Sequence, residues 1–255
     1  MKNFTQSVLL FCLLLISPAI FAQDNFWKDI PEAEAKNNDL KRIIIPEKYR
    51  TLSLNTSGLR AALNNAPQEF SPESRLTPLI MLLPMPDGTM GRFSITSYSM
   101  MEPGLQAQFP EIRTFSGQGI DDPTATVKLD WTEFGFHAMI LSPVKGSVWI
   151  DPYSRGDKEH YITYFKKDLT PRQHIEVGVL PAEGTGKETI NAFVAGGPCL
   201  AGTLRSYRLA VACTGEYAQA VGGTTAPLLH SAIVTSVNRV NGVYEQEVSI
   251  RLVLI

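Results

Sequence analysis

The chain has 255 residues, of which 44% are hydrophobic and 19% are charged, and its formal net charge is -2. This balance is typical of a globular protein and excludes a long disordered or fibrous chain. The near-zero charge gives no sign of a nucleic acid or an anionic membrane surface as a partner, and we expect neither.

Residues 1–22 have the pattern of a secretory signal peptide. Lys2 precedes an unbroken apolar run over residues 8–16, and Ser17-Pro18 and the small Ala22 follow. This order predicts export, with cleavage after Ala22. The alternative is a membrane anchor, but the run is shorter than the roughly 20 residues of a spanning helix. We therefore expect a secreted protein with no membrane span after signal removal.

Residues 23–176 read as one β-rich antiparallel domain. Mixed charges over residues 23–50 predict a loosely ordered lead-in. A short strand and a helix capped by Ser57 follow, with Leu59 and Leu63 on one helix face. Strands then dominate, with a hairpin turn at Asp87-Gly88. Short apolar runs separated by Gly, Pro and Asp predict further antiparallel strands over 125–132, 135–142, 146–153 and 160–167.

The composition changes over residues 177–203, which are rich in Gly, Ala and Thr and show no hydrophobic periodicity. This composition predicts a flexible linker and processing region between two domains. Lys187 and Arg205 are candidate processing points because they lie in or beside this stretch.

Residues 204–255 predict a strand, a helix and a second strand. The first strand covers residues 205–214, and the final one covers 247–255. Thr224 or Thr225 can cap the helix. Its apolar stripe consists of Leu229, Ile233, Val237, Val240 and Tyr244. This order predicts a crossover that opens a mixed α/β domain, so the whole chain is α+β. Two strands cannot be buried by one helix, so we expect the chain to stop inside this domain.

The charged and histidine residues form no recognisable catalytic motif. His137 alternates within a predicted strand, so a core or edge position is expected, and His230 is expected to face solvent. Asp121, Asp122 and Asp130 could bind calcium or work as acid and base, but an aspartate-capped turn is the favoured interpretation. The tripeptide at residues 155–157, Arg-Gly-Asp, is known from adhesion proteins, and a glycine turn explains it equally.

Two cysteines, Cys199 and Cys213, follow the signal peptide. Cys199 lies in the predicted flexible stretch, where a thiolate would be accessible as a zinc ligand. A disulfide between the two is the alternative. Cys213 could also be a small buried hydrophobe in its apolar strand. The residues alone leave these alternatives open.

The last 52 residues resemble the start of reprolysin-like zinc metallopeptidases, chiefly secreted bacterial members. The segments "LRSYRLAVACTGEY" and "VNRVNGVYEQEVSIRLVLI" carry this resemblance. The upstream segments "FPEIRTFSGQGIDDPTATVKLDWTEFGFHAMILSP" and "WIDPYSRGDKEHYITYF" are similar to the propeptides of those proteins.

The resemblance implies a zymogen that hydrolyses peptide bonds in proteins, in which the β-rich domain is the propeptide partner of the catalytic domain. It implies zinc bound by H-E-x-x-H-x-x-G-x-x-H, a motif that these 255 residues do not contain, so no catalytic residue is carried over. Calcium is a second candidate cofactor. The resemblance also implies a role for Cys199 as an inhibitory zinc ligand in the zymogen.

Two other functions compete with this interpretation. One is a non-enzymatic secreted binding or adhesion module built on the β-rich domain. The other is a propeptide-like protease inhibitor that acts on a separate peptidase.

Overall fold

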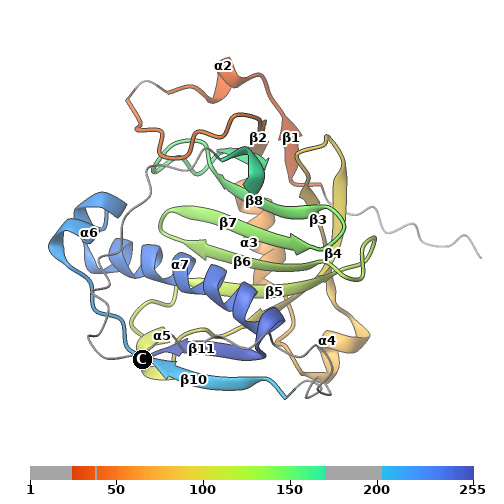
Figure 1. The fold of residues 1–255 in the computed structure, drawn as a ribbon, viewed down its shortest axis with the longest axis vertical. Coiled ribbons are helices and arrows are strands. Elements are labelled where there is room, and N and C mark those ends of the chain that lie inside the picture. Colours follow the sequence, from red (N-terminus) through yellow and green to blue (C-terminus); the bar gives the residue numbers. More distant parts are fainter. Residues whose placement is uncertain (1–24, 38, 170–202) are drawn as a thin grey trace, which may run out of the picture.

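A nine-stranded antiparallel sheet forms the body of the chain (Figure 1). The computed structural model describes residues 25–37, 39–169 and 203–255. The strand order is β1-β2-β9-β8-β7-β6-β5-β4-β3, so most neighbours in sequence are also neighbours in the sheet. Its strands are β1 (Trp27–Asp29), β2 (Arg50–Leu54), β3 (Leu79–Pro84), β4 (Met90–Tyr98), β5 (Arg113–Gly119), β6 (Thr126–Thr132), β7 (Gly135–Ser142), β8 (Gly146–Pro152) and β9 (His160–Phe165).

The helices are few, and most are short. They are α2 (Glu32–Ala35), α3 (Thr56–Asn64), α4 (Pro72–Leu76), α5 (Pro103–Gln106), the 3-10 turn η1 (Lys166–Asp168), α6 (Gly215–Val221) and α7 (Ala226–Glu247). The prediction of an α+β chain with an antiparallel sheet is confirmed. In the described ranges, no helix is both long and apolar enough to cross a membrane.

The turn residues explain why the hairpin at Asp87-Gly88 could be predicted from the sequence. Gly88 adopts a φ of +89°, a backbone conformation that favours glycine, and Asp87 accepts hydrogen bonds from Thr89. The helix cap was predicted at Ser57, but the residue that caps α3 is Asn55, whose side chain accepts from the Gly58 amide. Leu59 and Leu63 are buried as predicted.

Two parts of the sheet differ from the predictions. The prediction of a loosely ordered lead-in is wrong for residues 27–29. They form the edge strand β1 and bury the Trp27 side chain. Strand β5 was missed because its sequence, Arg-Thr-Phe-Ser-Gly-Gln-Gly, contains one large apolar residue and two glycines. Gly117 is required there, since a Cβ would lie 2.7 Å from the Ser94 carbonyl oxygen.

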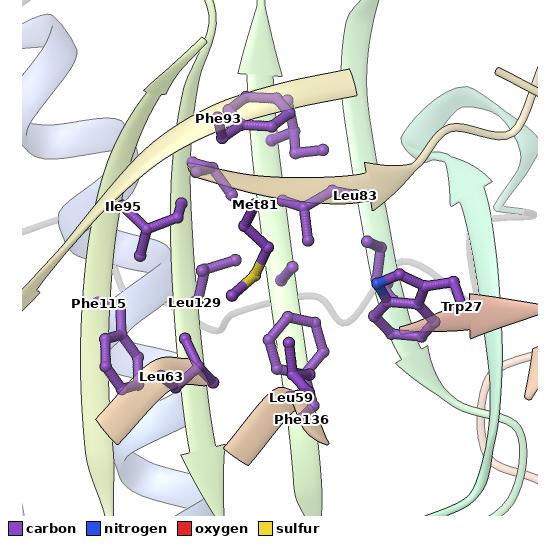
Figure 2. Packing of buried hydrophobic residues seen from close by; sticks show 14 of the residues in the cluster. Trp27, Leu59, Leu63, Met81, Leu83, Phe93, Ile95, Phe115, Leu129 and Phe136 are labelled. Atoms are coloured by element: carbon purple, nitrogen blue, oxygen red, sulfur yellow. The ribbon is translucent and has the colours of Figure 1, made fainter. Parts of the chain in front are cut away.

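The inner face of the sheet wraps around helix α3. Its apolar cluster draws side chains from every strand of the nine, from Trp27 on β1 to Tyr161 on β9. Figure 2 shows Leu59 and Leu63 of α3 lying against Phe115, Leu129 and Phe136. Burial of these side chains supplies the main driving force for folding of the sheet.

The C-terminal segment forms a separate two-stranded parallel sheet. Strand β10 (Arg205–Leu209) pairs in parallel with β11 (Ile250–Leu254), and helix α7 lies between them in sequence. This confirms the predicted order of strand, long helix and strand, but the short helix α6 before α7 was not predicted and both strands are shorter than predicted. Residues 205–208 of β10 are exposed.

Helix α7 begins after Thr225, one of the two predicted caps, but the Thr225 side chain makes no capping hydrogen bond. Ile233 and Val237 are buried as predicted, with Leu229 packed against their cluster. Val240 and Tyr244 are exposed instead, at 38% and 45%. The reason is that the buried face of the second half of the helix is polar and centres on Asn238, Asn241 and Gly242.

Candidate functional site: the interface between the sheet and helix α7

Helix α7 lies across the outer face of the sheet (Figure 1). This face is polar where the helix covers it. Strand alternation places Val127 and Leu129 in the inner core and turns Lys128 and Asp130 outward, under the helix. Lys128 and Asp130 are 6% and 2% exposed, and Asp151 on β8 is 1% exposed. Buried charges are costly unless they are paired, so the partners that the helix supplies decide whether this arrangement is stable.

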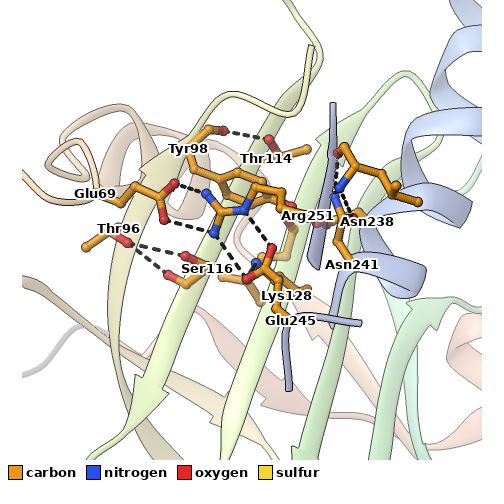
Figure 3. A network of polar contacts seen from close by, with 12 residues as sticks. Glu69, Thr96, Tyr98, Thr114, Ser116, Lys128, Asn238, Asn241, Glu245 and Arg251 are labelled. Atoms are coloured by element: carbon orange, nitrogen blue, oxygen red, sulfur yellow. Dashed lines mark hydrogen bonds and ion pairs between the residues drawn. The ribbon is translucent and has the colours of Figure 1, made fainter. Parts of the chain in front are cut away.

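An ionic cluster joins the C-terminal end of α7 to the sheet (Figure 3). Glu245 of α7 accepts a hydrogen bond of 2.8 Å from Lys128 Nζ and one of 2.7 Å from Arg251 Nε. Arg251, on β11, also pairs with Glu69, which belongs to the loop before α4. Charges therefore alternate between the two sides: Lys128 and Glu69 come from the sheet domain, and Glu245 and Arg251 from the C-terminal segment.

The ring of Tyr98 on β4 contacts both cations of this cluster. Lys128 Nζ is 4.3 Å from the centre of the Tyr98 ring, and Arg251 Cζ is 4.6 Å from it. Burial raises the pKa of the Tyr98 hydroxyl far above its usual value. Burial also lowers the pKa of Lys128, an effect that Glu245 opposes.

Glu245 shows that the pairing outweighs the cost of burial. Burial alone would raise its pKa, but hydrogen bonds and charges from Arg251 and Lys128 together hold the pKa of Glu245 below its usual value. Folding therefore favours the charged form of the Glu245 carboxylate, as expected for a buried carboxylate that is well paired.

A second group of polar contacts lies under the middle of α7. Asp130 accepts hydrogen bonds from Thr235 Oγ1 at 2.7 Å and from Asn238 Nδ2 at 3.2 Å, and its Oδ1 lies 3.0 Å from His137 Nδ1. Asn238 also donates to the Leu129 carbonyl and accepts from the Tyr98 hydroxyl. His137 is buried in a central strand, so of the two predicted positions the core is correct.

A third pair anchors the same helix face to strand β8. Arg239 of α7 pairs with Asp151, which also accepts a hydrogen bond of 2.7 Å from Tyr164. The guanidinium carbon lies 4.5 Å from the centre of the Trp149 ring. Burial alone would lower the pKa of Arg239, but Asp151 outweighs it and the pKa lies above its usual value.

Apolar contacts and one glycine complete the interface. Tyr98, Met100, Met101 and Ile112 of the sheet domain share a buried cluster with Ile233, Val234, Val237 and Leu254 of the C-terminal segment. A Cβ at Gly242 would lie 2.5 Å from Met139 Cε and 3.1 Å from Lys128 Cγ. The absence of a side chain at this position thus allows the helix to approach β6 and β7 closely.

Hydrogen bonds to the backbone of β11 occupy the edge of this strand that faces away from β10. The Leu254 amide donates to the Met100 carbonyl at 2.8 Å, and the Glu102 amide donates to the Leu254 carbonyl at 2.9 Å. At the neighbouring outward position, the Asn241 side chain accepts from the Leu252 amide and donates to its carbonyl, at 2.8 and 2.9 Å. The Glu102 carboxylate also pairs with Arg208 on β10.

The three aspartates singled out from sequence do not form one site. Asp121 pairs with Arg92, while Asp122 accepts from Thr124 and Ser142 in a turn, as the favoured interpretation predicted. Asp130 lies apart from them, under α7. These contacts give no support for calcium.

The Arg-Gly-Asp tripeptide also forms the predicted turn, with Gly156 at a φ of +83°. Asp157 is 8% exposed and accepts from the backbone amides of Glu159 and His160. Arg155 donates to the Ala220 carbonyl. Both charged side chains are thus engaged within the chain, which disfavours an adhesion role for this tripeptide.

Two other predicted residues differ from expectation. His230 does not simply face solvent, because its ring packs against Phe109 with centroids 4.1 Å apart and the planes tilted by 37°, and burial lowers its pKa. Cys213 is not a buried hydrophobe, because β10 ends at Leu209 and leaves this free thiol exposed. Cys199 and the stretch 177–202 lie outside the described residues, as do residues 1–22.

The sequence carried a signal for this interface that our predictions did not use. Polar residues occupy alternate positions of the strand Thr-Val-Lys-Leu-Asp-Trp-Thr, a pattern that predicts one polar face. Asn238, Asn241 and Gly242 interrupt the apolar stripe of α7 in the same way. Which residues meet across the interface is a tertiary property that spacing cannot give.

Comparison with known proteins finds a family model that matches the C-terminal segment. Residues 203–255 match the family model described as Metallo-peptidase family M12B Reprolysin-like. This match confirms the resemblance of the C-terminal segment and supports a reprolysin-like metallopeptidase. No curated protein and no solved structure matches the chain.

Zinc is the metal that such a family implies in general. Among the residues that the structure describes, no group of three or more His, Cys, Asp and Glu side chains could hold a metal ion. The described residues therefore do not fit a zinc site, and no step of peptide hydrolysis is assigned to them. What their geometry provides is a buried interface between the sheet and α7.

Proposed function

We propose that residues 204–255 open the catalytic domain of a secreted zinc metalloendopeptidase, and that the β-rich domain over residues 23–176 is its propeptide. The observation that carries this proposal is the reprolysin-like match over residues 203–255. The zinc ligands and the general base of the parent enzyme lie outside these 255 residues, which are inactive alone. The substrates are proteins or peptides.

The interface under α7 supports a propeptide role for the sheet. Contacts reach α7 along its length, from Ser231 through Asn238 to Glu245, and extend to Leu254 of β11. A domain that contacts the first long helix and both first strands of an enzyme is suited to hold them in position while the remainder folds. Residues 1–22 direct export and are removed after Ala22, and residues 177–203 connect the two parts and contain the processing point.

Expression of the open reading frame that encodes these residues tests the proposal. We expect hydrolysis of a protein substrate such as casein after processing, and loss of this activity with a zinc chelator. A processed product that is folded but inactive with added zinc would refute the proposal.

A role for Cys199 as an inhibitory zinc ligand is a separate element of the proposal. Replacing this residue, as Cys199→Ala, is expected to raise the activity of the unprocessed precursor, because the thiolate would no longer occupy a metal position. Cys213→Ala is the matched control, since Cys213 is exposed beyond β10. Equal activity of the Cys199→Ala precursor and the unaltered precursor would exclude this role.

A further inference from the structure

The charged groups at the interface are complementary across it. Lys128 pairs with Glu245, Glu69 with Arg251, and Asp151 with Arg239, in each case one residue from the sheet domain and one from the C-terminal segment. None of these six side chains is more than 19% exposed. Complementary buried pairs of this kind fix the orientation of two surfaces and reject other partners.

Affinity comes from the apolar cluster beside these pairs. Ile233, Val234, Val237 and Leu254 are at most 9% exposed, and they contact Tyr98, Met100, Met101 and Ile112 of the sheet domain. An apolar centre flanked by polar pairs is the anatomy of a stable association between two protein surfaces.

Main-chain contacts add to the affinity between the two parts. Met101 forms an isolated parallel bridge with Leu254, so the segment that follows β4 leaves the large sheet and pairs with the small one. The Ser99 hydroxyl donates to the Met101 carbonyl at 2.6 Å and stabilises this extended segment. The apolar, ionic and main-chain contacts all join residues that lie outside the connection between the two parts.

We propose that the sheet domain and residues 203–255 stay bound to each other as separate chains after the connection between them is cut. This proposal rests on the proposed function. If the sheet domain is the propeptide, cleavage between the domains is not sufficient to release it. A second event must weaken the interface under α7 before the catalytic domain is free.

The test uses the full chain with a protease recognition sequence inserted between residues 185 and 186. The folded chain is cut to completion and run on size exclusion at pH 7.5. We expect both pieces in one peak with the elution volume of the uncut chain. Two separate peaks, each containing one piece, would overturn the proposal.

A variant identifies the contacts responsible. Arg251→Met leaves Glu69 and Glu245 without their shared cation, and we expect the affinity between the cut pieces to fall on the order of 100-fold. Dilution of the cut protein with a labelled C-terminal piece, followed by fluorescence anisotropy, measures this affinity. Arg60→Met is the matched control, because Arg60 pairs with Glu111 at an exposed site away from α7 and should leave the affinity unchanged.

Lys128→Met provides a second variant if Arg251→Met fails to fold before cutting. Unchanged affinity in Lys128→Met would contradict the assigned role of the ion pairs. The experiment is independent of peptidase activity. An inactive parent enzyme would remove the propeptide role while the pieces still co-eluted, whereas separation of the pieces would leave the peptidase assignment intact.

Discussion

The two faces of the same nine-stranded sheet are built on opposite principles. The inner face is apolar and closes around α3, with side chains such as Phe136 and Leu129 fully buried. The outer face under α7 buries Lys128, Asp130 and Asp151 and pairs each with the helix or strand above it. Apolar burial is non-directional, while hydrogen-bonded charges require a particular partner in a particular position. The inner face therefore contributes stability, and the outer face contributes selection of a partner.

The largest effect should come from the inner face. Phe136→Ala removes a fully buried ring, and we expect the free energy of unfolding to fall by about 3–5 kcal/mol. Urea denaturation followed by circular dichroism measures it. Phe70→Ala, at a site 75% exposed, is the control and should change this free energy by less than about 0.5 kcal/mol. A similar loss in both variants would remove the distinction between core and surface.

Breaking one pair on the outer face should cost less. Arg239→Met leaves Asp151 buried without its cation, and we expect a loss of about 3 kcal/mol in the free energy of unfolding. The double variant with Asp151→Asn should recover most of it, because the charge is gone and the amide oxygen still accepts from Tyr164. A double-mutant cycle in urea reports the coupling, and strictly additive losses would argue against a direct pair.

Overpacking the closest approach of α7 to the sheet should have a moderate effect. Gly242→Leu places a side chain against Met139 and Lys128, and a cost of about 1–3 kcal/mol is expected in thermal or urea unfolding. Adding Met139→Ala should recover part of the lost stability, because it makes room for the new side chain. Gly104→Ala, where a Cβ meets nothing within 4 Å, is the control. Full tolerance of Gly242→Leu would mean that the helix does not lie as close as described.

The smallest effect should be the acid sensitivity of Glu245. Its pKa is lowered on folding from an ordinary value of 4.5, so its charged form stabilises the fold above pH 4.5, and this contribution is lost as the pH falls through the lower, folded pKa. The stability difference between the unaltered chain and Glu245→Gln should thus be largest near neutral pH and shrink below pH 4.5. A difference that stays constant down to pH 2 would show that the charge of Glu245 does not matter.

Much of the sheet could be predicted from sequence because local signals specify it. The runs at 125–132 and 135–142 alternate or are bounded by Gly, and they correspond to β6 and β7. Strand β5 has no such signal. Its pairing with β4 and β6 is imposed by neighbours, so tertiary context overrides local propensity there.

The interface was beyond sequence analysis for a different reason. Lys128 and Glu245 are 117 positions apart, and Glu69 and Arg251 are 182 apart, so no periodicity relates them. The helix itself was predictable from Thr225 and its apolar residues. Its polar buried face was not, because a polar residue on a predicted helix is normally assigned to solvent.

The Asn241 side chain has a further consequence for how molecules of this protein meet one another. Its amide presents to Leu252 the same donor and acceptor that a neighbouring strand would present, and Met100–Glu102 does so for Leu254. The outward backbone groups of β11 at these two positions are therefore already bonded within the chain. A second molecule could not extend the small sheet at this edge without first displacing an asparagine and a buried methionine segment.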